Sequence, residues 1–185
     1  MGKLVIYTGP MKGGKTTALL DKYNNEKYSY DFPEKLMLFK PIIDDRFSKH
    51  NVVTRDGKML SCTNVATIDD ILNMSERYDK FFIDEFQFLT GDIDRLIELS
   101  LFDKEFYIAG LNLTAERQPF GLMTKLFPYA TEIYLLYGNC DNCGALGEGI
   151  YTYFKGEKKQ DILVGEENYM CVCSSCYNKL IKHTN

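Results

Sequence analysis

The sequence predicts an α/β fold with a mainly parallel sheet, because apolar strand-like runs alternate with helical segments along most of the chain. A second observation is the glycine-rich stretch T-G-P-M-K-G-G-K-T-T-A-L-L at residues 8–20, which directly follows an apolar run. A third is the change of character after Gly138, where cysteine pairs and short polar pieces replace the alternation. We therefore expect a larger domain over residues 1–137 and a small second domain over residues 138–185.

Five short apolar runs have the length and composition of buried parallel strands. In chain order, these expected strands lie at residues 3–8, 35–40, 79–84, 105–109 and 131–137. The expected helices lie at residues 14–28, 67–77, 92–101 and 119–127. The second of these opens with Thr67 and Asp70 in a capping-box-like arrangement, which satisfies free N–H groups at a helix start. Sheets of this kind bind ligands at the carboxyl ends of their strands, where we look for functional residues.

Composition and charge narrow the class of protein. A hydrophobic fraction of 45% is enough for a packed core, and the net charge of −4 argues against a broad nucleic-acid interface. No apolar run is long enough to span a bilayer, and the chain opens directly with a strand, which leaves no room for a signal peptide. We therefore expect a cytoplasmic protein with no membrane and no nucleic-acid partner.

The glycine-rich stretch matches the pattern G-x-x-x-x-G-K-[ST], in which glycines let backbone N–H groups turn toward phosphate oxygens. A plain glycine-rich turn with a surface lysine is the alternative, but the strand before and the helix after favour a phosphate loop. Lys15 would then contact the β- and γ-phosphates of a nucleotide, and Thr16 would bind Mg²⁺. The residues expected to bind phosphate are Gly9, Pro10, Met11, Lys12, Gly13, Gly14, Lys15 and Thr16.

An acid pair follows the third expected strand, F-F-I-D-E at residues 81–85. An acidic residue at the end of a neighbouring strand is where phosphate-loop proteins hold Mg²⁺, so we expect Asp84 to share the ion with Thr16. Glu85 lies beside it and could accept the proton of an attacking hydroxyl or water. A helix cap or a solvated turn is the alternative for such a pair, and the phosphate loop makes the catalytic interpretation the stronger one.

Two C-x-x-C pairs predict a metal site. Cys140, Cys143, Cys173 and Cys176 can supply four thiolates in tetrahedral geometry, which suits a structural Zn²⁺ with no open position for catalysis. The segment between the pairs is longer than in compact zinc ribbons, so the ion would pin the base of a long excursion. A redox-active pair is the alternative, and two matched pairs disfavour it. Cys62 and Cys171 fit no such pattern.

These motifs, in this order, resemble those of the type II thymidine kinases, and the resemblance spans nearly the whole chain. Residues 9–17 are similar to that family's G-P-M-x-[SAG]-G-K-[ST] signature, and residues 39–48 (F-K-P-I-I-D-D-R-F-S) to its F-K-P-x-x-D-x-R-[YF]-S segment. The other matches are I-D-E-F-Q-F at 83–88, A-G-L at 109–111 with P-F-G at 119–121, and I-L-V-G at 162–165 with Tyr169, the family's lasso over the nucleoside.

The resemblance implies a RecA-like P-loop kinase domain with a small zinc-binding lasso domain. It implies transfer of the ATP γ-phosphate to the 5′-hydroxyl of thymidine, and of deoxyuridine, by a homotetramer. It assigns catalysis to Glu85 and Arg46, and adds Asp84 and Gln87 to the phosphate-binding set. For the nucleoside, it implies Met11, Phe88, Leu111, Phe120, Ile162, Leu163, Val164, Gly165 and Tyr169. Core packing is the alternative for each apolar member of that set.

The chain departs from the family pattern at three places. Asn112 stands where the family has Asp, and Ala115 where an aromatic ring would stack on the base. The segment Thr152-Tyr153-Phe154 lacks the arginine of the family's T-x-R, and the lasso turn has the single glycine Gly165. A missing ring removes stacking energy of about 1–3 kcal/mol, which would weaken nucleoside binding more than it would affect the chemistry.

A different class of function fits many of the same residues: a P-loop ATPase whose zinc module binds DNA or a protein. Such a DNA-binding module would need a basic surface. The stretch between the cysteine pairs carries more acidic than basic side chains, namely Asp141, Glu148, Glu157, Asp161, Glu166 and Glu167 against Lys155, Lys158 and Lys159. The charge balance therefore disfavours the DNA version.

Overall fold

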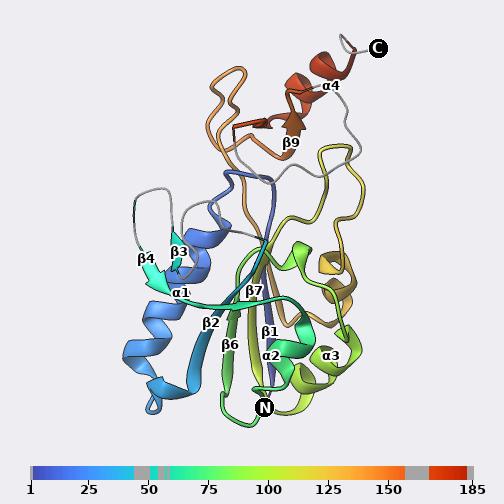
Figure 1. Cartoon of the computed structure of the whole chain (residues 1–185). Coiled ribbons are helices and arrows are strands. Elements are labelled where there is room, and N and C mark those ends of the chain that lie inside the picture. The colour runs from blue at the N-terminus through green and yellow to red at the C-terminus, as the bar shows by residue number, and fades with distance from the viewer. Residues whose placement is uncertain (1, 44–50, 54–56, 58, 157–166, 183–185) are drawn as a thin grey trace.

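The computed structural model describes residues 2–43, 51–53, 57, 59–156 and 167–182. Its centre is a six-stranded sheet in the order β5-β2-β6-β7-β1-β8, and every neighbouring pair runs parallel. Figure 1 shows this sheet between α1 on one side and α2 and α3 on the other. The α/β class with a parallel sheet, predicted from the alternation of apolar runs, is confirmed.

The elements follow the expected order along the chain. The strands of the main sheet are β1 (Lys3–Thr8), β2 (Leu36–Pro41), β5 (Thr63–Val65), β6 (Lys80–Ile83), β7 (Glu105–Gly110) and β8 (Glu132–Leu135). The helices around it are α1 (Lys15–Ser29), α2 (Ile68–Leu72) and α3 (Ile93–Phe102), with the 3₁₀ turns η1 (Pro33–Lys35), η2 (Phe86–Phe88) and η3 (Met123–Tyr129). A separate two-stranded sheet pairs β3 (Asn51–Val53) antiparallel with β4 (Met59–Ser61).

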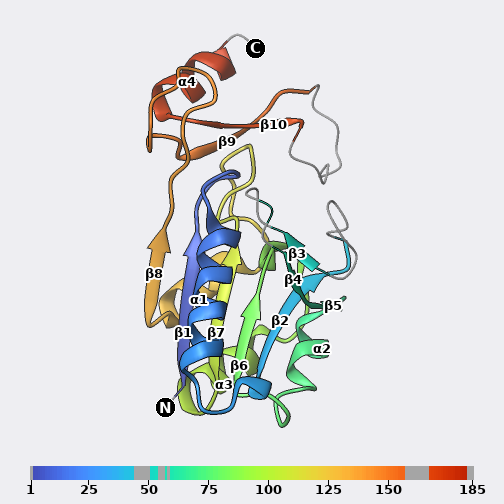
Figure 2. The ribbon, with the colours of Figure 1, turned by 90° about the vertical axis from the view of Figure 1, so that its left-hand side faces the viewer.

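Each face of the sheet is covered by its own apolar layer, as a parallel sheet requires. On the α1 face, Leu19 and Leu20 of the helix are fully buried, and the Phe82 ring stacks on Tyr107 with centroids 4.6 Å apart. On the opposite face, the ring of Phe81 stacks on Phe106 at 4.8 Å, beneath α2, α3 and η3. The strands that carry the site are therefore held rigidly from both sides (Figure 2).

The structure differs from the sequence analysis at three elements. The helix expected over residues 119–127 is the later 3₁₀ segment η3, because Pro119 pairs with Leu113 in a β-bridge and Gly121 has a φ of +55°. The helix expected to reach residue 77 ends at Leu72. The third is an omission: the sequence analysis did not predict β5, whose residues 63–65 extend the sheet beside β2 without a strong apolar pattern.

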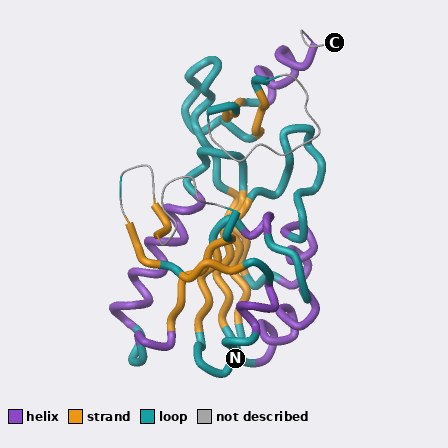
Figure 3. Tube along the Cα trace, in the orientation of Figure 1, coloured by secondary structure: helices purple, strands orange, loops and turns teal. Residues whose placement is uncertain are grey.

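A C-terminal module, residues 138–156 and 167–182, lies above the carboxyl ends of the strands (Figures 1 and 2). It consists of an antiparallel pair, β9 (Tyr151–Phe154) and β10 (Tyr169–Val172), followed by α4 (Ser174–Lys182). The module has a small apolar cluster of its own, which includes Val172 and Tyr177. Figure 3 shows that loops, rather than helices or strands, lie between the sheet and this module.

The longest helix among the described residues is α1, with 15 residues. Within that part of the chain, no helix combines the length and the apolar character that a bilayer crossing requires.

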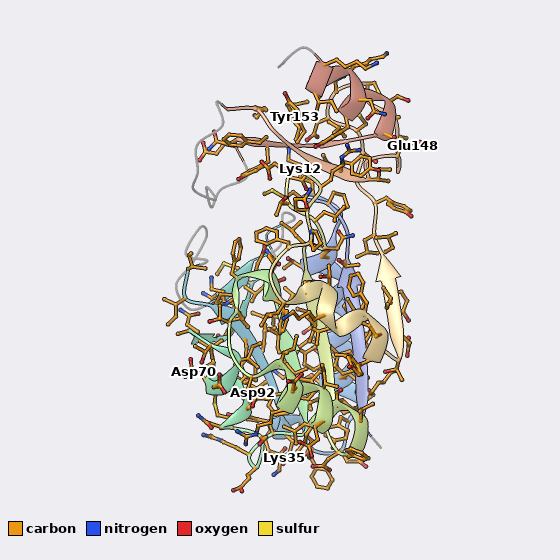
Figure 4. All side chains as sticks on the ribbon, turned by 90° about the vertical axis from the view of Figure 1, so that its right-hand side faces the viewer. Lys12, Lys35, Asp70, Asp92, Glu148 and Tyr153 are labelled. Carbon is orange, nitrogen blue, oxygen red and sulfur yellow. The ribbon has the colours of Figure 1, made fainter. Side chains whose placement is uncertain are left out.

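The capping box at the start of α2 is confirmed and generates a prediction about stability. The Thr67 hydroxyl accepts a hydrogen bond from the Asp70 N–H (3.2 Å), and the Asp70 carboxylate, labelled in Figure 4, accepts one from the Thr67 N–H (2.9 Å). Since α2 has only five residues and buries Ile68, Ile71 and Leu72, it depends strongly on this cap. Thr67→Ala should lower the free energy of unfolding by about 1 kcal/mol.

Urea unfolding monitored by circular dichroism measures this change. Thr67→Ser keeps the acceptor oxygen and serves as the matched control, so it should stay close to the parent protein. Equal losses in both variants would mean that the methyl group of Thr67, and not its hydroxyl, stabilises the helix.

Candidate active site and metal centre

The phosphate loop (residues 9–14) leaves the carboxyl end of β1 and leads directly into α1. Gly9 has a φ of +141°, and a Cβ at this position would collide with the carbonyl oxygen of Leu136. Gly14 has a φ of +82° and is the N-cap residue of α1. Both glycines of the motif are therefore required by backbone geometry, which turns the loop over the positive end of the helix.

Lys15 is the most deeply placed cation of the phosphate loop region. Its side chain is buried, and its ammonium group donates a hydrogen bond of 2.6 Å to the carbonyl oxygen of Pro10. The N–H of Gly13 donates to the same carbonyl at 3.2 Å. The loop thus curls around the lysine, so that its charge is held within the loop and away from bulk solvent.

Thr16 and Asp84 come together although 68 residues separate them in the sequence. The Thr16 hydroxyl lies 3.1 Å from each carboxylate oxygen of Asp84, and Asp84 is 5% exposed. The Asp84 N–H donates to the carbonyl oxygen of Phe39 at 3.0 Å, which fixes the turn after β6. A hydroxyl and a buried carboxylate side by side are the oxygen ligands that Mg²⁺ prefers.

Glu85 follows with a φ of +50°, in the left-handed region that non-glycine residues rarely adopt. Its carboxylate accepts a hydrogen bond from the side-chain amide of Gln87. The other end of that amide, the oxygen, accepts from the Leu111 N–H at 3.0 Å. Gln87 is buried and so links the turn after β6 to the turn after β7 while orienting Glu85. A strained residue of this kind is typical of a functional position.

Apolar side chains lie next to this polar group. The rings of Phe88 and Phe120 meet edge to face with centroids 5.6 Å apart, and Leu111 is buried. The N–H of Met11 donates to the Thr152 hydroxyl at 2.9 Å, which joins the phosphate loop to the C-terminal module. Tyr169 packs against Phe154 with centroids 5.2 Å apart. The predicted positions Arg46, Ile162, Leu163, Val164 and Gly165 lie outside the described residues.

The four cysteines of the two C-x-x-C pairs form one cluster. All four Sγ atoms lie within 4.8 Å of one another, and those of Cys143 and Cys173 are 3.9 Å apart. Four thiolates around Zn²⁺, with Zn–S bonds of about 2.3 Å, would be spaced about 3.8 Å apart, so the cluster fits this ion. Cys62 and Cys171 lie outside the cluster. The prediction that these four cysteines come together in one cluster that could hold a metal ion is confirmed.

Backbone N–H groups favour the thiolate form of one member of the cluster, Cys140. The Cys173 N–H donates to the Cys140 sulfur at 3.3 Å. Burial alone would raise the pKa of Cys140, but N–H groups of Cys173, Cys143 and Asn142 lower it to about 6. A group that is already ionised near neutral pH binds a cation without first losing a proton.

Four further residues, whose contacts the sequence analysis did not predict, join the module to the loops at the carboxyl ends of the strands. The Tyr177 hydroxyl donates to the Ala115 carbonyl at 2.6 Å, and the Arg117 guanidinium lies 4.8 Å from the Tyr177 ring. The Thr152 hydroxyl accepts a hydrogen bond from the Met11 N–H, and the Asp141 carboxylate lies 2.7 Å from the Lys12 ammonium group. Thr152 and Asp141 lie within motifs named above, but no motif predicts these contacts. A contact between segments more than 60 residues apart leaves no local pattern, so only the structure reveals it.

The glycine-rich loop, the buried lysine and the Thr16–Asp84 pair together define a P-loop nucleotide-binding protein. The chain belongs to the thymidine kinase family, since the profile described as "TK: Thymidine kinase" matches residues 2–177. The thymidine kinase of Pseudothermotoga lettingae is 30% identical over 181 residues, covering 97% of this chain and 96% of that protein.

Other members of the family are equally similar. The thymidine kinase of Bacteroides fragilis is 31% identical, covering 98% of this chain and 89% of that protein. The thymidine kinase of Amsacta moorei entomopoxvirus is also 31% identical, covering 94% of this chain and 96% of that protein. The resemblance read from the motifs is therefore confirmed, and with it the placement of this chain among the kinases.

The cysteine cluster generates a prediction about metal content. The purified protein should contain one Zn²⁺ per chain, and Cys173→Ser should lose it, because three thiolates hold the ion far less tightly. Elemental analysis by mass spectrometry measures the metal. Hydrogen exchange should show faster exchange in the C-terminal module and an unchanged rate in the main sheet.

Cys62→Ser is the matched control, since Cys62 lies outside the cluster and its loss should leave the zinc in place. A metal-free protein whose clustered cysteines form disulfides would rule out the zinc site.

Proposed function

We propose that this protein transfers the γ-phosphate of ATP to the 5′-hydroxyl of thymidine, forming the monophosphate. The observation that carries the proposal is the group at the carboxyl ends of β1, β6 and β7. There the Thr16 hydroxyl contacts Asp84, and Glu85 follows directly with its carboxylate held by Gln87. Phosphoryl transfer needs a nucleotide site, a magnesium site and an acceptor base within one small volume, and this group supplies candidates for all three.

On the nucleotide side, the N–H groups of the phosphate loop and the Lys15 ammonium bind the phosphates. Thr16 and Asp84 hold Mg²⁺, which neutralises phosphate charge when bound. The full set assigned to phosphate is Gly9, Pro10, Met11, Lys12, Gly13, Gly14, Lys15, Thr16, Asp84 and Gln87. Within this set, Gln87 has a positioning role, because its side-chain amide donates to the Glu85 carboxylate and accepts from the Leu111 N–H.

Glu85 acts as the general base that takes the proton from the 5′-hydroxyl. Its left-handed backbone and its bond to Gln87 hold the carboxylate in one orientation, so little reorganisation is needed during the reaction. Arg46 is the second catalytic residue of the proposal and stabilises charge on the transferred group.

The nucleoside base lies against apolar walls, as flat heterocycles do in buried sites. Phe88, Phe120 and Leu111 are three of the proposed wall residues. The rings of Phe88 and Phe120 contact each other, and the Leu111 N–H donates to Gln87. The remaining members of the proposed nucleoside set are Met11, Ile162, Leu163, Val164, Gly165 and Tyr169.

The proposal has further parts that rest on the family. They are deoxyuridine as a second acceptor, a homotetrameric assembly, a cytoplasmic location and a domain boundary between residues 137 and 138. The small separate sheet of β9 and β10 supports the boundary. Light scattering on the purified protein tests the assembly.

A phosphorylation assay with ATP, Mg²⁺ and a panel of nucleosides tests the function. We expect thymidine and deoxyuridine to be converted to monophosphates. ATP hydrolysis that is equally fast with and without any nucleoside would instead support the alternative, a P-loop ATPase whose zinc module binds another macromolecule.

The role of Glu85 yields a prediction about turnover. Glu85→Gln keeps the size and one hydrogen-bond acceptor but removes the base, so kcat should fall by about 10²–10⁴-fold. The affinity for ATP should stay nearly constant, because the phosphate loop is untouched. Steady-state kinetics and nucleotide titration measure the two quantities.

Glu98→Gln removes an equal charge from the exposed face of α3 and should leave kcat unchanged. Turnover of Glu85→Gln within a few-fold of the parent enzyme would exclude Glu85 as the base.

Ala115 yields a prediction about substrate affinity. Ala115 is half-buried, and its carbonyl oxygen accepts a hydrogen bond from the Tyr177 hydroxyl. Phe86 and Tyr153 are two aromatic residues that could fill the space of the missing ring. Phe86, however, is fully buried in the core, and Tyr153 packs on Tyr177 with centroids 6.1 Å apart. We therefore expect a roomy pocket that tolerates bulky substituents on the base.

Ala115→Phe should lower the KM for thymidine by up to about tenfold and leave kcat unchanged, since stacking stabilises the ground and transition states alike. Ala115→Leu adds volume without a flat ring and should give a smaller gain. If Ala115→Phe abolishes thymidine binding while ATP still binds, another side chain already fills this space.

A further inference from the structure

Lys12 occupies an unusual position in the phosphate loop. It has a φ of +64°, a left-handed conformation that costs energy for any residue with a Cβ. Its side chain points away from the loop toward the C-terminal module, where its ammonium group lies 2.7 Å from the Asp141 carboxylate. Figure 4 shows Lys12 at this junction, below Tyr153 of the module. The conformation of one loop residue is thus tied to a residue 129 positions later.

Asp141 is itself rigidly placed. It lies between Cys140 and Cys143, inside the first cysteine pair. The carboxylate oxygen that receives Lys12 also accepts the Cys171 N–H at 2.9 Å, and the Asp141 N–H donates to the Cys171 carbonyl at 2.7 Å. Exposed ion pairs stabilise little, mainly because two mobile side chains must be ordered. Here one partner is already fixed by the cysteine cluster and β10.

Two further contacts hold the same part of the loop. The Met11 N–H donates to the Thr152 hydroxyl of β9 at 2.9 Å. Gly138 passes so close to the Lys12 carbonyl oxygen that a Cβ on it would lie only 3.0 Å away. Lys12 and its neighbour therefore contact the module through a side chain and a backbone N–H, and the backbone of Gly138 passes close to the Lys12 carbonyl. All three features oppose a change of loop conformation.

We propose that Asp141 is a positioning residue for the phosphate loop: through Lys12 it keeps the loop in the conformation in which its N–H groups converge on phosphate. The cysteine cluster thereby supports nucleotide binding as well as the fold of its own module. The inference rests on the nucleotide-binding part of the proposed function and is independent of which nucleoside is phosphorylated.

A competing explanation predicts the opposite change in nucleotide affinity when the Asp141 charge is removed. If Asp141 only draws the Lys12 ammonium away from the phosphates, its removal would free a cation for the nucleotide and tighten binding. Under our proposal, its removal lets the loop relax from the binding conformation and weakens binding. Asp141→Asn discriminates between the two, because it keeps the shape of the side chain and removes the charge.

Isothermal titration calorimetry with Mg-ATP and with Mg-ADP, in the absence of thymidine, measures the effect. Asp141→Asn should weaken both nucleotides by about three- to tenfold. Lys12→Met should weaken them similarly, and the double variant should lose no more than either single one. Lys12→Gly should regain most of the affinity lost in Lys12→Met, since glycine adopts a positive φ without support.

Glu148→Gln is the matched control. It removes the same charge from an exposed position of the module, labelled in Figure 4 and separate from Lys12, and should not change affinity. The zinc content of Asp141→Asn must stay at the level of the parent protein. The KM for ATP should rise alone, whereas a loosened module would also raise the KM for thymidine.

Three results would overturn the proposal. They are nucleotide affinity in Asp141→Asn equal to that of Glu148→Gln, tighter binding in Asp141→Asn, and Lys12→Gly as weak as Lys12→Met. If the protein binds nucleotides as expected but phosphorylates no nucleoside, the proposed function fails and this inference still stands.

Discussion

The parallel pairing of β6, β7 and β1 is the constraint on which the site depends. In this register Ile83 and Ile6 both lie level with Ile108, so β6 ends as β1 approaches the phosphate loop. Asp84 and Thr16, far apart in sequence, therefore meet at one edge of the sheet. A slip of one residue would turn Asp84 away from the loop and bury it in the opposite apolar layer. Tight packing of aromatic rings on both faces makes such a slip costly.

At the amino ends of the same strands, charged residues stabilise the fold and take no part in the proposed site. Lys80 is buried there and lies 2.6 Å from Glu26 and 3.3 Å from Glu105. Although burial would lower the pKa of Lys80, these carboxylates raise it and keep the group charged. Glu105 also accepts the Tyr107 hydroxyl. Every buried side-chain nitrogen or oxygen atom in the described part of the chain has a hydrogen-bond partner. Buried polar groups are therefore paired at both ends of the strands.

The sequence was sufficient for the parts of the structure that are encoded locally. Five of the six strands of the main sheet are short continuous apolar runs, the phosphate loop has glycines with a strict backbone requirement, and the cysteine pairs have a fixed ligand spacing. The segment after Gly121 misled the analysis, because its apolar spacing suits a helix while the preceding bridge to Leu113 delays and tightens the turn. The ties of Thr152 and Asp141 to the loop could not be predicted, since they join residues that share no local pattern.

The ties between the phosphate loop and the module also bear on how the chain folds during synthesis. β1 and the loop are translated early, but their partners come late: Thr131 pairs with Leu4, Asp141 with Lys12, and Thr152 with Met11. A nascent chain can assemble β2, β6 and β7 around β1 while the loop still lacks its supports. Closure across more than 120 residues carries a high entropic cost, so these contacts form after the sheet has brought the segments near. The phosphate loop is synthesised before most of the sheet, but its supports are complete only when the cysteine-rich segment has emerged from the ribosome.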